Sequence, residues 1–192
     1  MKKLLFIDAC ISRNLSRTKK ICATYIEEFM KKYPDTSIET VVLRPGKVEP
    51  HDKDLLIEKD SYVRAKDWNQ PMFDLARQFK EADYIVVGAP YWDLSFPSIL
   101  KVYVENVVVA DFTFKATENG FEGLCDIEKL VYISTAGGFI NGANFGYEYF
   151  CGLAKMLGIA ETEQIQAEAL DIEGYDADAI VEQTIAEMKQ RI

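Results

Sequence analysis

Hydrophobic and polar residues follow a repeating order along the chain: a short apolar run, then a longer segment whose apolar residues recur every three or four positions. The apolar runs have the length of β-strands, which predicts strands at residues 3–7, 37–43, 84–89, 129–134 and 163–167. The helical spacing predicts helices within residues 19–33, 52–66, 67–82, 97–107, 149–157 and 177–188. Pro34 and Gly158 mark helix ends, Pro97 suits a first helical position, and Asp176 suits an N-cap.

Strands that alternate with helices predict an α/β fold with a parallel sheet, right-handed crossovers and helices on both faces. The continuous apolar runs at 84–89 and 129–134 support this fold, because a parallel strand is buried on both faces. Ligands of such sheets bind outside the carboxyl ends of the strands. Three loops follow predicted strand ends, at residues 10–18, 90–97 and 135–139, and we expect them to meet in space.

Composition and charge narrow the class of protein. The 192 residues, 48% of them hydrophobic, fit a single domain over residues 1–192 with a well-buried core. A formal net charge of −9 argues against nucleic acid and anionic membranes as partners, since both are negatively charged. No run approaches the roughly 20 apolar residues of a membrane helix.

The cysteines and the lone histidine exclude two further kinds of site. The four cysteines include no Cys-x-x-Cys pair, which favours free thiols in the cytoplasm and argues against zinc. His51 follows Pro50 in a polar connection, where we expect it to be solvated rather than part of an active site.

The loop between the first strand and the first helix has the composition of a phosphate site. It contains Ser12, Arg13 and Asn14, followed by Ser16-Arg17-Thr18 at the expected start of the helix. The first turn of a helix offers unpartnered N–H groups and partial positive charge, so hydroxyls placed there can hold a phosphate. The loop lacks the glycines of a dinucleotide turn and the Gly-Lys-Ser/Thr of a nucleoside triphosphate loop. Simple capping of the helix by Ser16 or Thr18 is the alternative.

The other two loops are suited to a flat ring. Tyr91 and Trp92 place two aromatic side chains at the ligand-binding edge, where they would stack on a ring or, alternatively, plug the end of the sheet. Gly137-Gly138 would let a ligand approach the backbone closely, or would simply form a tight turn. A phosphate at one loop and a ring between the other two describe flavin mononucleotide (FMN) better than a dinucleotide, whose pyrophosphate prefers a glycine-rich turn.

Four segments carry a family resemblance that covers nearly the whole chain. They are Ser16-Arg17-Thr18, Ala89-Pro90-Tyr91-Trp92-Asp93-Leu94, the stretch from Phe112-Thr113-Phe114 through Thr117-Glu118-Asn119-Gly120 to Gly123-Leu124, and Ser134-Thr135-Ala136-Gly137-Gly138. These segments resemble the FMN-dependent NADH:quinone oxidoreductases known as azoreductases. The resemblance implies a flavodoxin-like α/β fold with a five-stranded parallel sheet in the order 2-1-3-4-5, one FMN per subunit, and a homodimer with active sites at the subunit interface.

The resemblance also implies roles for individual residues. The phosphate and ribityl chain of FMN would be held by Cys10, Ser16, Arg17 and Thr18. The isoalloxazine would be contacted, largely through backbone groups, by Pro90, Tyr91, Trp92, Asp93 and Leu94. Its other side would be flanked by Thr135, Ala136, Gly137 and Gly138. The substrate pocket would be formed by Phe114, Phe121 and Phe139, with the region around the first two reaching the partner subunit.

Three positions depart from the family's pattern. Cys10 stands where serine is common, Asp93 where asparagine is common, and Phe139 follows the glycine pair where a polar or different aromatic residue occurs. An Asp93 carboxylate that faced the ring would disfavour the reduced anionic flavin and lower its reduction potential. A side chain that points away is the alternative.

In the implied reaction, reduced nicotinamide (NADH or NADPH) stacks on the flavin and gives a hydride to N5. A quinone, azo compound or nitroaromatic then takes the same place, which predicts ping-pong kinetics. The flavin performs the redox step, so no catalytic residue of the chain is required. Two alternatives are a flavodoxin-type electron carrier without NAD(P)H turnover, and a protein that keeps the fold, binds no flavin and acts through dimer contacts. The helical segment 52–66 and Thr117-Glu118-Asn119-Gly120 argue against the carrier, which needs neither.

Overall fold

The structure is a computed structural model that describes residues 1–11 and 16–192. Within these residues, five parallel strands form the main sheet: β1 (Lys3–Asp8), β2 (Ser37–Val42), β3 (Tyr84–Gly88), β6 (Lys129–Thr135) and β7 (Glu161–Ala167). Their order across the sheet is β2-β1-β3-β6-β7. Numbered along the chain within this sheet alone, the strands run 2-1-3-4-5, which confirms the predicted sheet.

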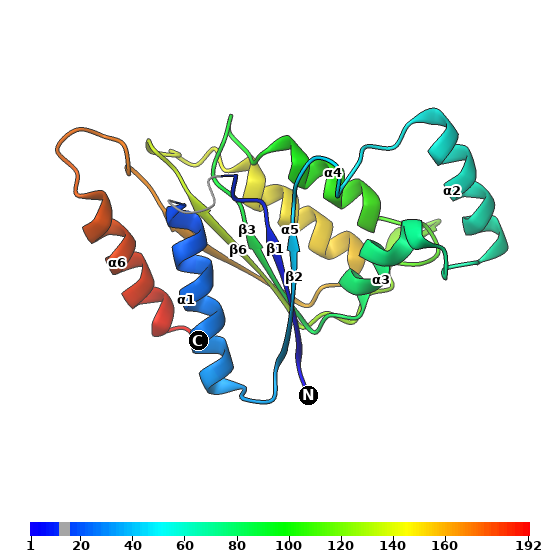
Figure 1. The fold of residues 1–192 in the computed structure, drawn as a ribbon, viewed down its shortest axis with the longest axis horizontal. Coiled ribbons are helices and arrows are strands. Elements are labelled where there is room, and N and C mark those ends of the chain that lie inside the picture. The colour runs from blue at the N-terminus through cyan, green and yellow to red at the C-terminus, as the bar shows by residue number, and fades with distance from the viewer. Residues whose placement is uncertain (12–15) are drawn as a thin grey trace.

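Helices cover both faces of the sheet. They are α1 (Arg17–Lys32), α2 (Lys53–Ala65), the 3-10 turn η1 (Pro71–Phe73), α3 (Asp74–Lys80), α4 (Ser98–Val107), α5 (Phe145–Leu157) and α6 (Ala177–Lys189). Figure 1 shows α1 and α6 on one face and α3, α4 and α5 on the other, while α2 stands at the far end of the molecule. Within the described residues, no helix is both long and apolar enough to span a membrane.

The sheet separates two hydrophobic cores, which explains the continuous apolar runs in the sequence. Leu5 and Ile7 of β1 point into the core beneath α4 and α5. Leu4 and Phe6 point into the core beneath α1 and α6. Because successive side chains of a strand alternate between faces, a strand covered on both sides must be apolar at every position.

Several predicted helix ends are confirmed, and two predicted starts are wrong. Gly158 ends α5 with a left-handed backbone (φ 85°), and the Asp176 carboxylate caps α6 by accepting from Ala179 N at 3.0 Å. The helix predicted from residue 67 begins as the turn η1, because Pro71 supplies no N–H for a continuous helix. Pro97 is the extended N-cap of α4 (ψ 139°) rather than its first residue.

A β-hairpin that was not predicted follows α4. Its antiparallel strands β4 (Phe114–Thr117) and β5 (Gly120–Gly123) are joined across Glu118 and Asn119. The dipeptide Asn119-Gly120 was the available sequence signal, since Asn-Gly is a strong marker of tight hairpins. The strands themselves are short and largely exposed, so they lack the apolar pattern that reveals the main sheet.

Candidate functional site

The loops after β1, β3 and β6 meet at the carboxyl edge of the main sheet. Ala9 N donates a hydrogen bond to Gly88 O, and Tyr91 N donates to Thr135 O, each at 2.9 Å. The side-chain oxygens of Thr18 and Thr135 lie 2.6 Å apart and join the start of α1 to the end of β6. The three loops predicted to meet are therefore neighbours.

Ser16 is the N-cap of α1. Its backbone is extended, and its Oγ accepts a hydrogen bond from Lys19 N at 3.2 Å. The capping alternative is thus realised, but a serine hydroxyl that accepts one hydrogen bond still has its own hydrogen to donate. Capping of the helix and binding of an anion are compatible at this residue. The other polar residues predicted for this loop, Ser12, Arg13 and Asn14, lie outside the described residues.

Arg17 and Thr18, the next two residues, face different surroundings. Arg17 Nη1 lies 2.8 Å from Asp171 Oδ1, and the Asp171 side chain is 72% exposed. An ion pair this exposed contributes little to stability, so Arg17 is free to exchange the carboxylate for another anion. Thr18 is buried, and its hydroxyl serves the link to Thr135.

An ion pair with one buried partner, Asp8, lies between the end of β1 and α1 and was not found from the sequence. Asp8, the last residue of β1, is 1% exposed, and its Oδ2 lies 2.7 Å from Lys19 Nζ of α1. Its second oxygen, Oδ1, accepts from Cys10 N at 3.0 Å. Both carboxylate oxygens are thereby satisfied, which a buried charge requires. The signal in the sequence was an acidic residue at the end of an otherwise apolar strand.

Cys10 lines the site as a neutral thiol. Its side chain is buried, and Sγ lies 3.7 Å from Gly88 O. Burial is the main cause that raises the pKa of this thiol to about 12. Since the thiolate is the reactive form of cysteine, Cys10 acts here as a small weak donor.

The second loop forms a tight two-residue turn. Trp92 N donates to Ser95 O (3.1 Å), and Ser95 N donates to Trp92 O (2.7 Å). The two central residues, Asp93 (φ 48°) and Leu94 (φ 68°), both have left-handed backbones. Such turns favour asparagine, glycine and aspartate, which accounts for the residue type at position 93. Within the described part of the chain, the N–H groups of Asp93 and Leu94 have no acceptor.

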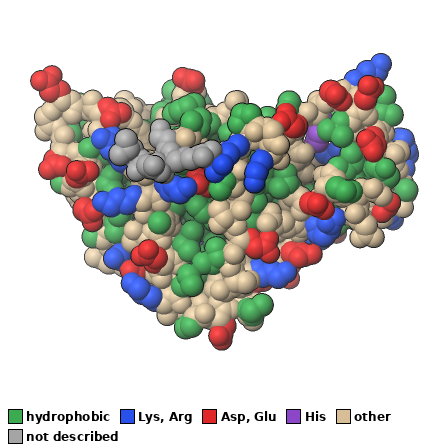
Figure 2. Space-filling view, viewed as in Figure 1, with side chains coloured by type: hydrophobic (Ala, Val, Ile, Leu, Met, Phe, Trp, Pro, Cys, Tyr) green, Lys and Arg blue, Asp and Glu red, His purple; other side chains and the backbone are tan. Residues whose placement is uncertain are grey.

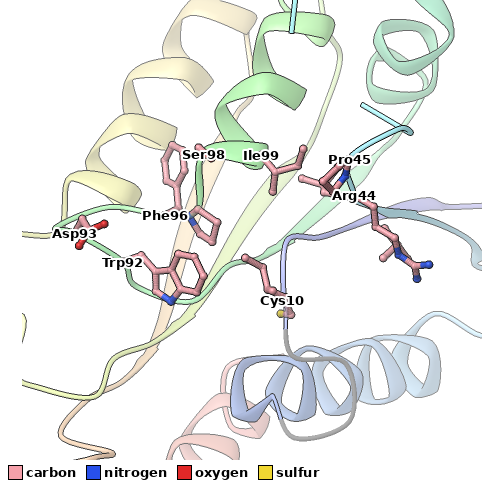
Figure 3. Close-up of a pocket in the computed structure, with 12 residues that line it drawn as sticks. Cys10, Arg44, Pro45, Trp92, Asp93, Phe96, Ser98 and Ile99 are labelled. Carbon is pink, nitrogen blue, oxygen red and sulfur yellow. The ribbon is translucent and has the colours of Figure 1, made fainter. Parts of the chain in front are cut away.

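Some side chains of this loop hold it in place, and others are exposed at its surface. Tyr91 Oη donates to Ala143 O at 2.9 Å, so this ring ties the loop to the segment before α5. Trp92 is 47% exposed and keeps a free aromatic face, next to the half-buried Pro90. Figure 3 shows the Asp93 carboxylate on the opposite side of the Trp92 indole from Cys10. Asp93 nevertheless lines the cavity described below, and both orientations considered for its carboxylate relative to a bound ring stay predictions.

The two glycines of the third loop have different amounts of free space around their backbones. An added Cβ at Gly138 would have no atom within 4 Å, so open space lies over its backbone. At Gly137 the same Cβ would come within 2.5 Å of Asp171 Oδ2. Thr135 is half-buried and Ala136 is buried, and Ala136 N donates to Ala167 O at 2.9 Å. The loop therefore combines a fixed base with an accessible backbone at Gly138.

The three predicted pocket phenylalanines are not brought together. Phe139 is exposed beside the third loop, with its ring centroid 5.7 Å from that of Tyr175. Phe114 and the 63% exposed Phe121 pack edge to face on the β4–β5 hairpin. This hairpin follows the carboxyl end of α4, whereas Trp92 precedes its amino end, and a ten-residue helix is about 15 Å long. Within one chain, Phe114 and Phe121 lie away from the three loops.

A cavity of about 900 Å³ opens between the first two loops and the end of β2 (Figure 3). Its walls include Cys10, Trp92 and Phe96, and also a segment that sequence reasoning missed, residues 42–45. That segment carried no unusual residue pattern beyond the turn at Pro45-Gly46. Figure 2 shows Lys and Arg side chains around the grey segment on this face of the molecule.

His51 lies outside this site. It lines a separate groove of about 420 Å³ between α2, α4 and α5, and it is half-buried rather than solvated as predicted. Burial, followed by the nearby Lys59 charge, lowers its pKa. Within residues 1–11 and 16–192, no group of three or more histidine, cysteine or carboxylate side chains is arranged to hold a metal ion.

Comparisons with known proteins agree with this geometry. The family model described as "Flavodoxin-like fold" matches residues 2–192. An FMN-dependent NADH:quinone oxidoreductase 2 of Clostridium acetobutylicum is 36% identical over 198 aligned residues, covering 100% of this chain and 98% of the relative. An FMN-dependent NADH:quinone oxidoreductase of Clostridium beijerinckii is 35% identical, covering 99% and 98%.

A solved structure shares the fold at lower sequence similarity. It is an FMN-dependent NADH-azoreductase of Bacillus anthracis in complex with FMN, with a TM-score of 0.85 and 24% identity over 100% of this chain and 97% of its own. At that level of identity, the likeness carries the fold alone.

Proposed function

The chain belongs to the family of FMN-dependent NADH:quinone oxidoreductases with the flavodoxin-like fold, and from this we propose that it binds FMN. We further propose that it uses NADH to reduce quinones, azo compounds and related aromatic acceptors. The observation that carries the proposal is the convergence of three loops at one sheet edge. They supply a serine-capped helix start, a turn with two unused N–H groups beside the exposed Trp92, and the open backbone of Gly138.

The residues of this edge fit both ends of FMN. At the phosphate end, Ser16 and Arg17 would hold the anion at the start of α1, Cys10 would face the ribityl chain, and Thr18 would fix the loop. At the ring end, Pro90, Tyr91, Trp92, Asp93 and Leu94 would line one side, and Thr135, Ala136, Gly137 and Gly138 the other. The open space over Gly138 leaves room for a flat ring against the backbone.

When bound, FMN supplies the redox chemistry by accepting a hydride from NADH and passing the electrons to the acceptor. The chain binds and orients the reactants. The N–H groups of Asp93 and Leu94 are hydrogen-bond donors for negative charge that develops on the ring, and Trp92 offers an aromatic face that excludes water. NADPH is the alternative donor, and we expect donor and acceptor to occupy the same place in turn, with ping-pong kinetics.

The first test is anaerobic mixing of the FMN-loaded protein with NADH, with NADPH in parallel. We expect NADH to bleach the flavin absorbance near about 450 nm, and a quinone to restore it. Free FMN at the same concentration is the control, because its direct reduction by NADH is slow without a site that aligns the two rings. A loaded protein whose absorbance stays unchanged would be an electron carrier, and a protein that takes up no FMN would act by other means.

We further propose that the protein works as a homodimer. The β4–β5 hairpin carries the exposed Phe121 at the opposite end of α4 from the three loops. If Phe114 and Phe121 line a substrate pocket, they can do so only over the site of a second copy. Phe139, in contrast, stands next to the third loop and would belong to the site of its own chain.

The homodimer predicts a particle of twice the 21.8 kDa chain mass. Light scattering on the FMN-loaded protein, at the concentration used for turnover, measures this mass directly. Substitution of Phe121 by alanine should then raise the KM for the acceptor without changing FMN affinity, since the hairpin does not contact the FMN loops of its own chain. A fully active monomer would contradict the proposal.

A further inference from the structure

Arg44 is a charged residue of the 900 Å³ cavity that the proposed function does not use. It follows the edge strand β2 and lines the cavity together with Pro45. Figure 3 shows Arg44 and Trp92 on opposite sides of this cavity, with Cys10 between them. Arg44 thus borders the same cavity as the aromatic ring beside the proposed flavin site, with its guanidinium at the end of the side chain farther from Trp92 in this view.

The backbone holds Arg44 firmly in this place. Its carbonyl oxygen accepts hydrogen bonds from Lys47 N (3.1 Å) and Val48 N (3.3 Å), which close a turn around Pro45-Gly46. The two acids nearest along the chain, Glu39 and Glu49, are engaged elsewhere: Glu39 accepts from Gln78 Nε2 at 2.5 Å, and Glu49 accepts from Gly46 N at 2.6 Å. The turn therefore fixes the backbone position from which the Arg44 side chain extends, and a rigid support of this kind favours specific recognition.

The charge of Arg44 has no counterpart in the described structure. Its Nε is buried and has no hydrogen-bond acceptor among the described residues, and no carboxylate there lies within ion-pair distance of the side chain. A buried donor without an acceptor is costly, and a water molecule or an anion that pairs with the same guanidinium is among the partners that would offset this cost. Asp93, the acid that also lines the cavity, lies at its far side (Figure 3).

The rest of the cavity is suited to an aromatic ring. Leu43, Phe96 and Ile99 contribute apolar walls, and Trp92 contributes an exposed ring face. Because the chain has a net charge of −9, an anion needs a local cation to bind. The combination of apolar walls with one fixed cation describes a site for a flat molecule that carries an acidic group.

We propose that Arg44 binds the acidic group of the aromatic substrate, so that the enzyme prefers reactants bearing a sulfonate, carboxylate or phosphate. The inference deepens the proposed function and rests on it, because it takes the ring beside Trp92 to be a reactant of the flavin. Arg44 pairs with planar or tetrahedral oxyanions through its forked N–H groups. The anion is either a substituent of the acceptor or a phosphate of the nicotinamide dinucleotide.

The first experiment tests whether the anion belongs to the electron acceptor. It measures the binding of quinones to the oxidised, FMN-loaded protein without NADH, so that no turnover occurs. The ligands are anthraquinone sulfonate and hydroxymethyl-anthraquinone, which share one ring system and differ in charge. Titration calorimetry should show that Arg44→Gln weakens sulfonate binding by about tenfold or more. Binding of the neutral quinone should change by less than about twofold, and Arg44→Lys should restore part of the sulfonate affinity.

The second experiment tests whether the anion is a phosphate of the dinucleotide. It measures the KM for NADH, with the neutral quinone as acceptor. A rise in this KM on Arg44→Gln assigns the anion to the dinucleotide, and a loss of sulfonate binding assigns it to the acceptor. The matched control is Lys47→Gln, which removes the same charge from an exposed position in the same turn and should change neither quantity. Unchanged values for Arg44→Gln in both experiments, or equal losses for Lys47→Gln, would overturn the proposal. Bleaching of the flavin at saturating NADH tests the proposed function separately from both of these measurements.

Discussion

Alanine at both Ser16 and Thr18 is expected to weaken FMN binding by on the order of 100-fold. A hydrogen bond from the Ser16 hydroxyl to the phosphate contributes about 2 kcal/mol, and loss of the neutral Thr18–Thr135 bond adds about 1 kcal/mol, so we expect a total loss of about 3 kcal/mol. Ser16 would lose its own donor to the phosphate. Thr18 would lose the 2.6 Å contact that holds the loop to Thr135. Titration of the FMN-free protein, followed by quenching of flavin fluorescence, measures the affinity.

The control separates the loss of the phosphate contact from the loss of a helix cap. Ser16 caps α1, so its removal also costs about 1 kcal/mol of stability. Asp176 caps α6 in the same way, with its carboxylate 3.0 Å from Ala179 N. Asp176→Ala should lower the stability by a similar amount and leave FMN affinity unchanged. Equal FMN affinity in the Ser16/Thr18 variant and the native protein would remove these residues from the phosphate site.

The main sheet could be predicted because the burial of its strands requires apolar runs that are visible in the sequence. A strand buried on both faces must be apolar at each position, and β3 and β6 show that as continuous runs. The order of the strands, in contrast, came from the family resemblance. The β4–β5 hairpin escaped prediction because its residues are mostly exposed and its stability comes from a turn and from docking, which periodicity does not register.

The site was predictable to the level of loops but not of contacts. Loops that follow parallel strands must meet at the carboxyl edge, so Tyr91 and Thr135 could be expected near one another, and they are linked by a backbone hydrogen bond. The Asp8–Lys19 pair and the position of Arg44 depend on which side chains face each other across elements. The spacing of apolar and polar residues along the chain does not predict such contacts between elements. Asp93 is instructive in another way, since its residue type reflects a left-handed backbone as much as any ligand.

The hairpin is held to the body of the protein by a crossing of two glycine backbones. A Cβ on Gly123 would stand 2.1 Å from Gly158 N and 2.2 Å from the carbonyl carbon of Leu157. Neither side has freedom to move. Gly158 N is bonded to Ala154 O at 2.9 Å, and Cys125 N, two residues after Gly123, is bonded to Leu157 O at 3.0 Å. The obstacle to a side chain is backbone, which cannot rotate away as a side chain could.

Substitution of Gly123 by alanine should therefore destabilise the protein by about 3 kcal/mol, which lowers the melting temperature by roughly 10 °C in a chain of this size. Gly152→Ala is the matched control, because it makes the same chemical change at an exposed position of α5 with no atom within 4 Å of the new Cβ. Alanine is the better helix former, so this variant should gain about 0.5–1 kcal/mol. Thermal unfolding followed by circular dichroism compares the two.

Below the melting temperature, Gly123→Ala should still bind FMN, since the three loops lie at the opposite edge of the sheet from the crossing. It should lose acceptor affinity if the hairpin serves a partner's site. A Gly123→Ala protein that melts with the native one would show that the hairpin is not docked on the end of α5.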